Sequence, residues 1–104
     1  MAGNKIGLNA AGDAALPNYW GVTIAEYAQG TLIGTDGDGL SDVLERNVIS
    51  GNMGPGIYVG DLDGEITIAG NYIGLDPGGT TARPNEAGIY LEDAAQVLIG
   101  TNGD

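Results

Sequence analysis

The feature that most constrains this chain is an internal repeat. The segment Ala2–Gln29 can be laid over the segment Ala69–Gln96, and nearly half of the aligned positions are identical. A one-residue deletion then aligns LIGTDGD, which begins at Leu32, with LIGTNGD, which begins at Leu98. Periods of tens of residues are typical of solenoids and propellers, in which one small unit recurs. The repeat therefore predicts shorter units that follow one another in a fixed order.

Short apolar runs bounded by Gly or Asn do recur, and they fall into three groups. The first group has the pattern Asn-X-Ile, the second has Gly-apolar-X-apolar, and the third has apolar residues that end in Ile before a Gly or an Ala-Gly pair. The runs begin, in chain order, at Asn4, Gly21, Thr31, Asn47, Gly56, Ile66, Asn71, Gly88 and Val97. The groups therefore appear in the same order three times. This order predicts three coils, each with three short strands.

The apolar residues within these runs alternate with polar or aromatic ones, as expected for strands with one face toward a core. The residues of the second group that are predicted to point inward are Val22, Ile24, Ile57, Val59, Ile89 and Leu91. Those predicted to point outward are Thr23, Tyr58 and Tyr90. Because equivalent strands of successive coils run in the same direction, each group is predicted to form a parallel sheet.

Stacking the coils predicts columns of identical residues. Isoleucine recurs in the first group at Ile6, Ile49 and Ile73, and in the third group at Ile33, Ile68 and Ile99. Asparagine recurs at a corner, at Asn4, Asn47 and Asn71, where the side-chain amides are predicted to bond along the stack as a ladder. An antiparallel sandwich of nine short strands is the alternative fold. It does not explain why the groups recur in a fixed order.

The segments RNVISGN from Arg46, GNYIG from Gly70, and LIGT resemble the repeats of right-handed parallel β-helix proteins. Such repeats occur in large secreted or surface-attached bacterial proteins and in carbohydrate-active enzymes. The resemblance covers nearly the whole chain and implies an all-β fold, a right-handed parallel β-helix of about three coils with three short strands each. It also implies that residues 1–104 are one domain, a fragment of a longer repeat protein, located outside the cell or at the cell surface.

The net charge and the absence of Cys and His narrow the range of possible functions. The chain has 14 acidic and three basic residues, a formal net charge of −11, so its surface repels phosphate backbones and anionic lipids. Neither nucleic acid nor a membrane is expected as a partner. The chain has no Cys and no His, which excludes disulfides, thiolate metal sites and a histidine general base.

Two loops, residues 9–20 and 76–87, leave from the same corner after a strand of the first group and are predicted to lie together. Insertions in solenoid repeats often form a binding surface on one side. Aromatic rings stack on the apolar faces of sugars, and carboxylates bond to sugar hydroxyl groups. The candidate ligand-binding residues are Tyr19, Trp20, Asp76, Arg83 and Glu86, with a polysaccharide as the candidate ligand. The pair Tyr58 and Tyr90 has an alternative role as a cross-strand contact that stabilises the sheet.

The loop at residues 35–46 is acidic and is the candidate metal site. Calcium takes six to eight oxygen ligands in a flexible geometry, and it is the candidate cofactor here. An EF-hand register starting at Asp36 fails, because Ser41 stands where a Gly is required and Asn47 where a bidentate Glu is required. A solvated acidic turn is the alternative. The candidate calcium ligands are Asp36, Asp38, Asp42 and Glu45.

No catalytic residue is predicted. β-Helix hydrolases resemble one another in aspartates with a nearby His, and this chain has none. β-Helix lyases pair calcium-binding carboxylates with a Lys or Arg, for which only Lys5, Arg46 and Arg83 are available. We therefore predict a non-catalytic structural or adhesive module and not an enzyme. The alternative is a β-helix that binds or cleaves a polysaccharide with the loops at 9–20 and 76–87.

A stack of three coils, about 4.8 Å apart, has two large ends relative to its height. Each end is predicted to present unpaired strand edges and a layer of Ile, Val and Leu. Association end to end into a homo-oligomer is therefore predicted, either as a two-fold dimer or as a head-to-tail filament. The alternative is that loops or a strand of the same chain cover an end.

Overall fold

The computed structural model describes residues 1–25, 30–35, 42–62, 65–94 and 97–100. These residues form nine strands and one helical turn. In chain order the elements are β1 (Lys5–Ile6), β2 (Val22–Ala25), β3 (Thr31–Gly34), α1 (Asp42–Glu45), β4 (Val48–Ile49), β5 (Pro55–Leu62), β6 (Ile66–Ala69), β7 (Tyr72–Ile73), β8 (Ala87–Ala94) and β9 (Val97–Ile99).

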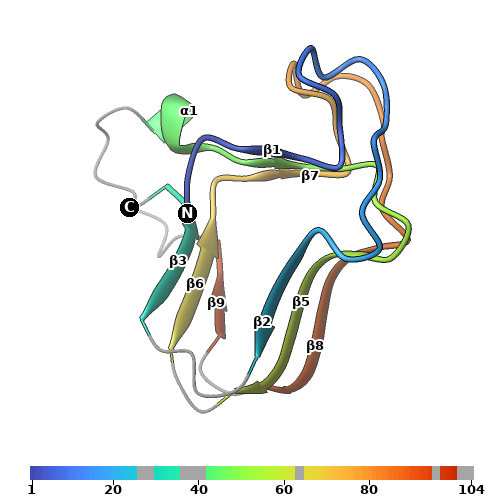
Figure 1. Cartoon of the computed structure of the whole chain (residues 1–104). Coiled ribbons are helices and arrows are strands. Elements are labelled where there is room, and N and C mark those ends of the chain that lie inside the picture. The colour runs from blue at the N-terminus through green and yellow to red at the C-terminus, as the bar shows by residue number, and fades with distance from the viewer. Residues whose placement is uncertain (26–29, 36–41, 63–64, 95–96, 101–104) are drawn as a thin grey trace.

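The strands form three sheets of three strands each: β1-β4-β7, β2-β5-β8 and β3-β6-β9, which we call the first, second and third sheets. Every strand pairing in these sheets is parallel. The chain visits the three sheets in turn three times around a common interior, which gives a solenoid-like fold (Figure 1). We call each circuit a coil, so that β1–β3 belong to the first coil, β4–β6 to the second and β7–β9 to the third. The predicted strand groups are confirmed, and the antiparallel sandwich is wrong.

The predicted columns of isoleucine are also confirmed. Ile6 pairs with Ile49, and Ile49 pairs with Ile73, along the first sheet. Ile33, Ile68 and Ile99 follow one another in the same way along the third sheet. In these two columns the register therefore places isoleucine on isoleucine at each level of the stack. A shift of one residue would instead turn every apolar side chain of a strand outward.

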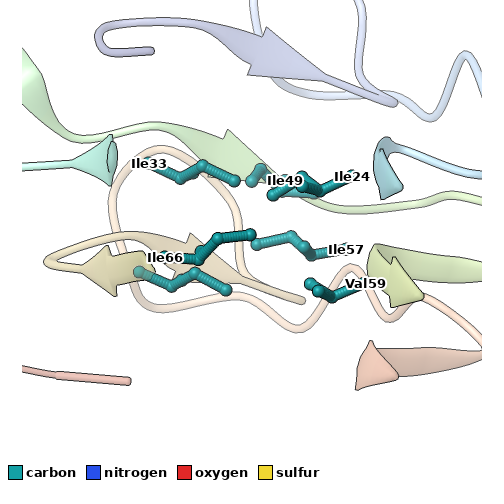
Figure 2. Packing of buried hydrophobic residues seen from close by; sticks show 7 residues of the cluster. Ile24, Ile33, Ile49, Ile57, Val59 and Ile66 are labelled. Atoms are coloured by element: carbon teal, nitrogen blue, oxygen red, sulfur yellow. The ribbon is translucent and has the colours of Figure 1, made fainter. Parts of the chain in front are cut away.

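The core is the set of side chains that the three sheets direct inward. Its buried members are Ile24, Ile33, Ile49, Ile57, Val59, Ile66 and Ile68. Figure 2 shows Ile24 and Ile33 pointing toward each other across the interior, and Ile57 and Ile66 meeting in the next layer. Full burial of one such side chain stabilises a fold by about 1.5–3 kcal/mol. The core therefore depends on aliphatic side chains from all three sheets.

Two local features differ from the sequence predictions. Strands β5 and β8 are each eight residues long, longer than the predicted apolar runs, because their pairing continues past the apolar residues to Leu62 and Ala94. The segment predicted as an acidic loop contains the single helical turn α1. This turn begins at Asp42, and Leu44 and Glu45 within it are good helix formers. Among the described residues, no helix has the length and hydropathy needed to cross a membrane.

Candidate functional site

The predicted asparagine ladder runs along one corner of the stack. The backbone N–H and the Nδ2 of Asn4 both donate to Oδ1 of Asn47, each over 3.0 Å. The same two groups of Asn47 donate to Oδ1 of Asn71, over 3.2 and 2.9 Å. Asn47 is fully buried, so these bonds satisfy polar groups that solvent does not reach. The predicted ladder is confirmed.

A second ladder, which the sequence analysis missed, lies at the corner between the first and second sheets. The backbone N–H and Nδ2 of Asn18 donate to Oδ1 of Asn52, over 3.1 and 3.3 Å. Those of Asn52 donate to Oδ1 of Asn85, over 3.0 and 2.9 Å. The signal was the Pro-Asn pair kept in both copies of the long repeat, at Asn18 and Asn85. In the second coil Gly51 precedes Asn52, and this change conceals the third member.

The loops at 9–20 and 76–87 lie side by side, as predicted (Figure 1). Arg83 Nη2 donates to the carbonyl of Asp13 over 3.0 Å. The same type of turn also occurs once in each loop. Asn9 Oδ1 accepts the N–H of Asp13 over 3.0 Å, and Asp76 Oδ1 accepts the N–H of Thr80 over 3.0 Å. The candidate residue Asp76 therefore has the same turn-forming role that neutral Asn9 has in the first copy.

The carboxylate of Asp76 is stabilised in its charged form by its own loop. The backbone N–H of Thr80, and then that of Thr81, lower the pKa of Asp76 below its ordinary value of 3.8. Both N–H groups donate to Oδ1, over 3.0 and 3.3 Å. Hydrogen bonds to the charged form of a carboxyl group favour that form. This carboxylate therefore helps to hold the turn.

The other candidate ligand residues lie in two places. The guanidinium of Arg83 joins the two loops through Asp13, and its Nε is buried without a partner among the described residues. Glu86 is exposed just before β8. Tyr19 and Trp20 are exposed before β2, at 69% and 46%. Among the described residues, no hydrogen bond, ion pair or ring contact joins Tyr19 or Trp20 to the other three candidates.

Three aromatic rings form a column on the outer face of the second sheet, one from each coil. Trp20 and Tyr58 are stacked with centroids 5.3 Å apart and planes at 10°. Tyr58 and Tyr90 are stacked with centroids 5.5 Å apart and planes at 13°. Tyr19 meets Trp20 edge to face, and the Tyr58 hydroxyl donates to Glu92. The rings therefore cover one another's faces along the stack, as the cross-strand alternative for Tyr58 and Tyr90 predicted.

The candidate calcium loop is only partly described. Asp36 and Asp38 lie outside the described residues. Asp42 begins α1 and Glu45 ends it. Within the described part of the chain, no group of three or more Asp, Glu, His or Cys residues is placed to hold a metal ion. The calcium prediction stays a prediction.

Ser50 is buried directly after β4 of the first sheet and has a structural role. Its hydroxyl donates to the carbonyl of Leu75 over 2.7 Å and accepts the N–H of Gly74 over 3.0 Å. Both partners belong to the third coil. This side chain therefore links the second coil to the third by donating to one group of the third coil and accepting from another.

The two ends of the stack differ. In the third coil Leu91 and Ile99 are 45% and 53% exposed, although they occupy inward positions. In the first coil the equivalent residues Ile24 and Ile33 are only 6% and 1% exposed. The prediction that both ends expose an aliphatic layer is therefore right for the third coil and wrong for these residues of the first.

Met1 lies over the outer edge of β3. Its N-terminal ammonium donates to the carbonyl of Leu32 over 2.8 Å, and its carbonyl accepts the N–H of Gly34 over 2.8 Å. This is the bonding pattern of a parallel strand residue opposite Ile33. Met1 thus takes the position that one residue of a further strand would have on the third sheet, opposite Ile33.

Comparison with protein-family models, with curated proteins and with solved structures finds no match.

Proposed function

We propose that this chain is a structural module, a right-handed parallel β-helix outside the cell or at its surface, that associates with a second copy through the end of its third coil. Three parallel sheets visited in a fixed order support the β-helix. Crossovers between parallel strands of one sheet are right-handed in about 98% of cases, which supports the handedness.

The observation that carries the proposal is the exposure of inward-pointing residues in the third coil. Ile99 is 53% exposed, whereas Ile68, one level earlier in the same column, is 2% exposed. Leu91 is 45% exposed, whereas Val59 is fully buried. A further level of strands over β7, β8 and β9 would bury this layer and pair the open strand edges.

The free energy gained by burying the exposed apolar layer is large enough for reversible association of two copies. Burying about 400 Å² of apolar surface contributes on the order of 10 kcal/mol at about 25 cal/mol per Å². Loss of translational and rotational freedom costs about 4–15 kcal/mol. Because the two quantities are similar, the extent of association is expected to depend on protein concentration. The net charge of −11 opposes association, so added salt is expected to strengthen it.

The candidate loops and the aromatic column favour a structural role over sugar binding. A sugar platform needs exposed ring faces, whereas Tyr58 is stacked between Trp20 and Tyr90, and one face of each of these two end rings lies against Tyr58. Polar groups of Asp76 and Arg83 bond to the backbone of the loops. Both observations are consistent with a non-catalytic module.

Size-exclusion chromatography with light scattering, over a dilution series at two salt concentrations, tests the proposal. The wild-type chain is expected to show a mass that rises with concentration and salt. The double variant Leu91→Lys/Ile99→Lys places two charges in the exposed layer and is expected to remain a monomer. A matched control, Ala10→Lys/Ala14→Lys, adds the same charge to exposed positions of the loop at 9–20 and is expected to associate like wild type. A monomeric wild-type chain under all conditions would overturn the proposal.

A further inference from the structure

We infer that the two copies meet head to tail, with the third coil of one against the first coil of the next, and not through a two-fold axis. The inference rests on the proposed association and adds its orientation and its consequence, which is open-ended growth. It is carried by the direction of the asparagine ladders, by the strand register and by the aromatic column.

Both ladders have a direction along the stack. In each step the backbone N–H and Nδ2 of one Asn donate to Oδ1 of the Asn in the following coil. The outer members at the first coil, Asn4 and Asn18, therefore present Oδ1 acceptors that no donor among the described residues reaches. The outer members at the third coil, Asn71 and Asn85, present backbone N–H donors that meet no acceptor among the described residues.

This direction distinguishes the two ways in which ends can meet. If two third coils meet, the free N–H groups of Asn71 and Asn85 face the same donors of the partner, and burying such groups without acceptors is costly. If a third coil meets a first coil, the N–H of Asn71 faces Oδ1 of Asn4, and the N–H of Asn85 faces Oδ1 of Asn18. Head-to-tail contact therefore repeats the bonds already present within the chain.

The internal repeat supports the same orientation. The third coil resembles the first over Ala69–Gln96 and Ala2–Gln29, so the third coil presents a surface similar to the one that the first coil presents to the second. The aromatic column ends at Tyr90 on this side, with 47% of its surface exposed. Trp20 opens the column in the first coil, so a head-to-tail neighbour continues the column with its own Trp20.

Met1 occupies one position that the neighbour needs. It lies opposite Ile33 at the edge of β3, and in a head-to-tail contact Ile99 of the neighbouring copy belongs opposite Ile33. Association over the third sheet therefore exchanges Met1 for β9 of the neighbour. Among the described residues, no backbone group pairs with the outer edge of β2 as Met1 does with β3, so the test of orientation is placed on the second sheet.

Cysteine cross-linking reads out the orientation directly, because the natural chain has no Cys. Ala25 pairs with Gly60, and Gly60 pairs with Glu92, so head-to-tail contact places Glu92 of one copy beside Ala25 of the next. Both residues are exposed. Strands about 4.8 Å apart satisfy the roughly 4.4–6.8 Å between Cα atoms that a disulfide requires.

The experiment uses the single variants Ala25→Cys and Glu92→Cys, mixed in equal amounts and oxidised with diamide. A disulfide between the two different variants is expected to dominate, with little cross-linking of either variant alone. The control mixture, Ala10→Cys with Glu92→Cys, places one Cys on the loop at 9–20 and is expected to yield little product. Urea unfolding of each variant, followed by Trp20 fluorescence, verifies that it is folded.

Light scattering of the wild-type chain separates this inference from the proposed function. A monomer overturns both. A mass that keeps rising with concentration, together with the mixed disulfide, supports head-to-tail growth. A mass that stops at twice the chain, dimers of one Cys variant with itself, or association without the mixed disulfide overturns the orientation and leaves the proposed association in place.

Discussion

The first and third coils have closely related sequences but differently exposed apolar residues. Ile33 and Ile99 occupy the same column of the third sheet, yet they are 1% and 53% exposed. The difference arises because Ile33 has β6 on one side and Met1 on the other, whereas β9 has a described neighbour only in β6. In a stacked fold, the burial of a side chain is therefore determined by the adjacent levels more than by its own sequence.

The largest test of this difference is truncation of the two isoleucines. Ile33→Ala is expected to lower the free energy of unfolding by about 4 kcal/mol, because it leaves a cavity in the core. Ile99→Ala is expected to cost less than about 1 kcal/mol in the monomer, because the side chain is already half exposed. Urea unfolding at low protein concentration measures both. Equal losses would contradict the comparison, and a loss for Ile99→Ala that grows with concentration would indicate that association buries this residue.

The first asparagine ladder provides a second comparison, between its middle member, Asn47, and its outer member, Asn4. Asn47→Ala is expected to cost about 3 kcal/mol, because it removes a buried amide and leaves the N–H of Asn4 without its acceptor. Asn4→Ala removes an exposed side chain and is expected to cost about 1 kcal/mol. The two unfolding midpoints in urea give the difference. An effect of Asn4→Ala as large as that of Asn47→Ala would show that position in the stack does not matter.

Two equivalent glycines, one with an adjacent coil beside it and one without, allow the effect of that coil on stability to be measured separately. Gly34 and Gly100 have φ of 103° and 100°, which non-glycine residues rarely adopt. A Cβ at Gly34 would collide with the carbonyl of Ala69 in the next coil, whereas a Cβ at Gly100 meets no described atom within 4 Å. Both substitutions to Ala incur the backbone strain, but Gly34→Ala is expected to cost about 1–3 kcal/mol more through the collision. Equal midpoints in urea would contradict this expectation.

The smallest expected effect concerns the loops of the two copies. The pKa of Asp76 is lowered in the folded chain, so its charge stabilises the fold above the ordinary value of 3.8, and this contribution is lost as the pH falls through the folded pKa. Asp76→Asn copies the neutral Asn9 of the first copy. The variant is expected to lose less stability than wild type between pH 6 and pH 3, as measured by urea unfolding. Identical losses would show that this carboxylate does not contribute.

The strand order, the register and the first ladder could be predicted from the sequence. Alternating apolar residues fix which side of each strand is buried, and Asn4, Asn47 and Asn71 stand at the same distance before their isoleucines. The second ladder was missed because the chain before its members varies in length. Twelve positions separate Ile6 from Asn18, whereas three separate Ile49 from Asn52. A fixed spacing between residues can be recognised in a sequence. A contact between residues that follow inserted loops of different length, as in the second ladder, cannot be recognised in this way.

The candidate site was harder to predict, because carboxylate and aromatic side chains can either bind a ligand or make structural contacts within the chain. The carboxylate of Asp76 was predicted to bind a ligand, and its oxygen bonds to its own loop. Trp20 was predicted as a loop aromatic, and it belongs to a column with Tyr58, which depends on how the loop enters the second sheet. The pairing of Met1 opposite Ile33 is formed by backbone groups, and a pattern of side chains does not predict it.

The corner that carries both long loops shows where this architecture accepts new sequence. The N–H of Leu16 donates to the carbonyl of Gly7, and the N–H of Arg83 donates to that of Gly74, each over 2.8 Å, so both loops leave and return at nearly the same point. The second coil crosses this corner without such a loop and still joins the ladder through Asn52. A peptide grafted into either long loop, between Gly7 and Leu16 or between Gly74 and Arg83, would have its ends close together and would be displayed outside the scaffold while every rung of the ladders keeps its partners.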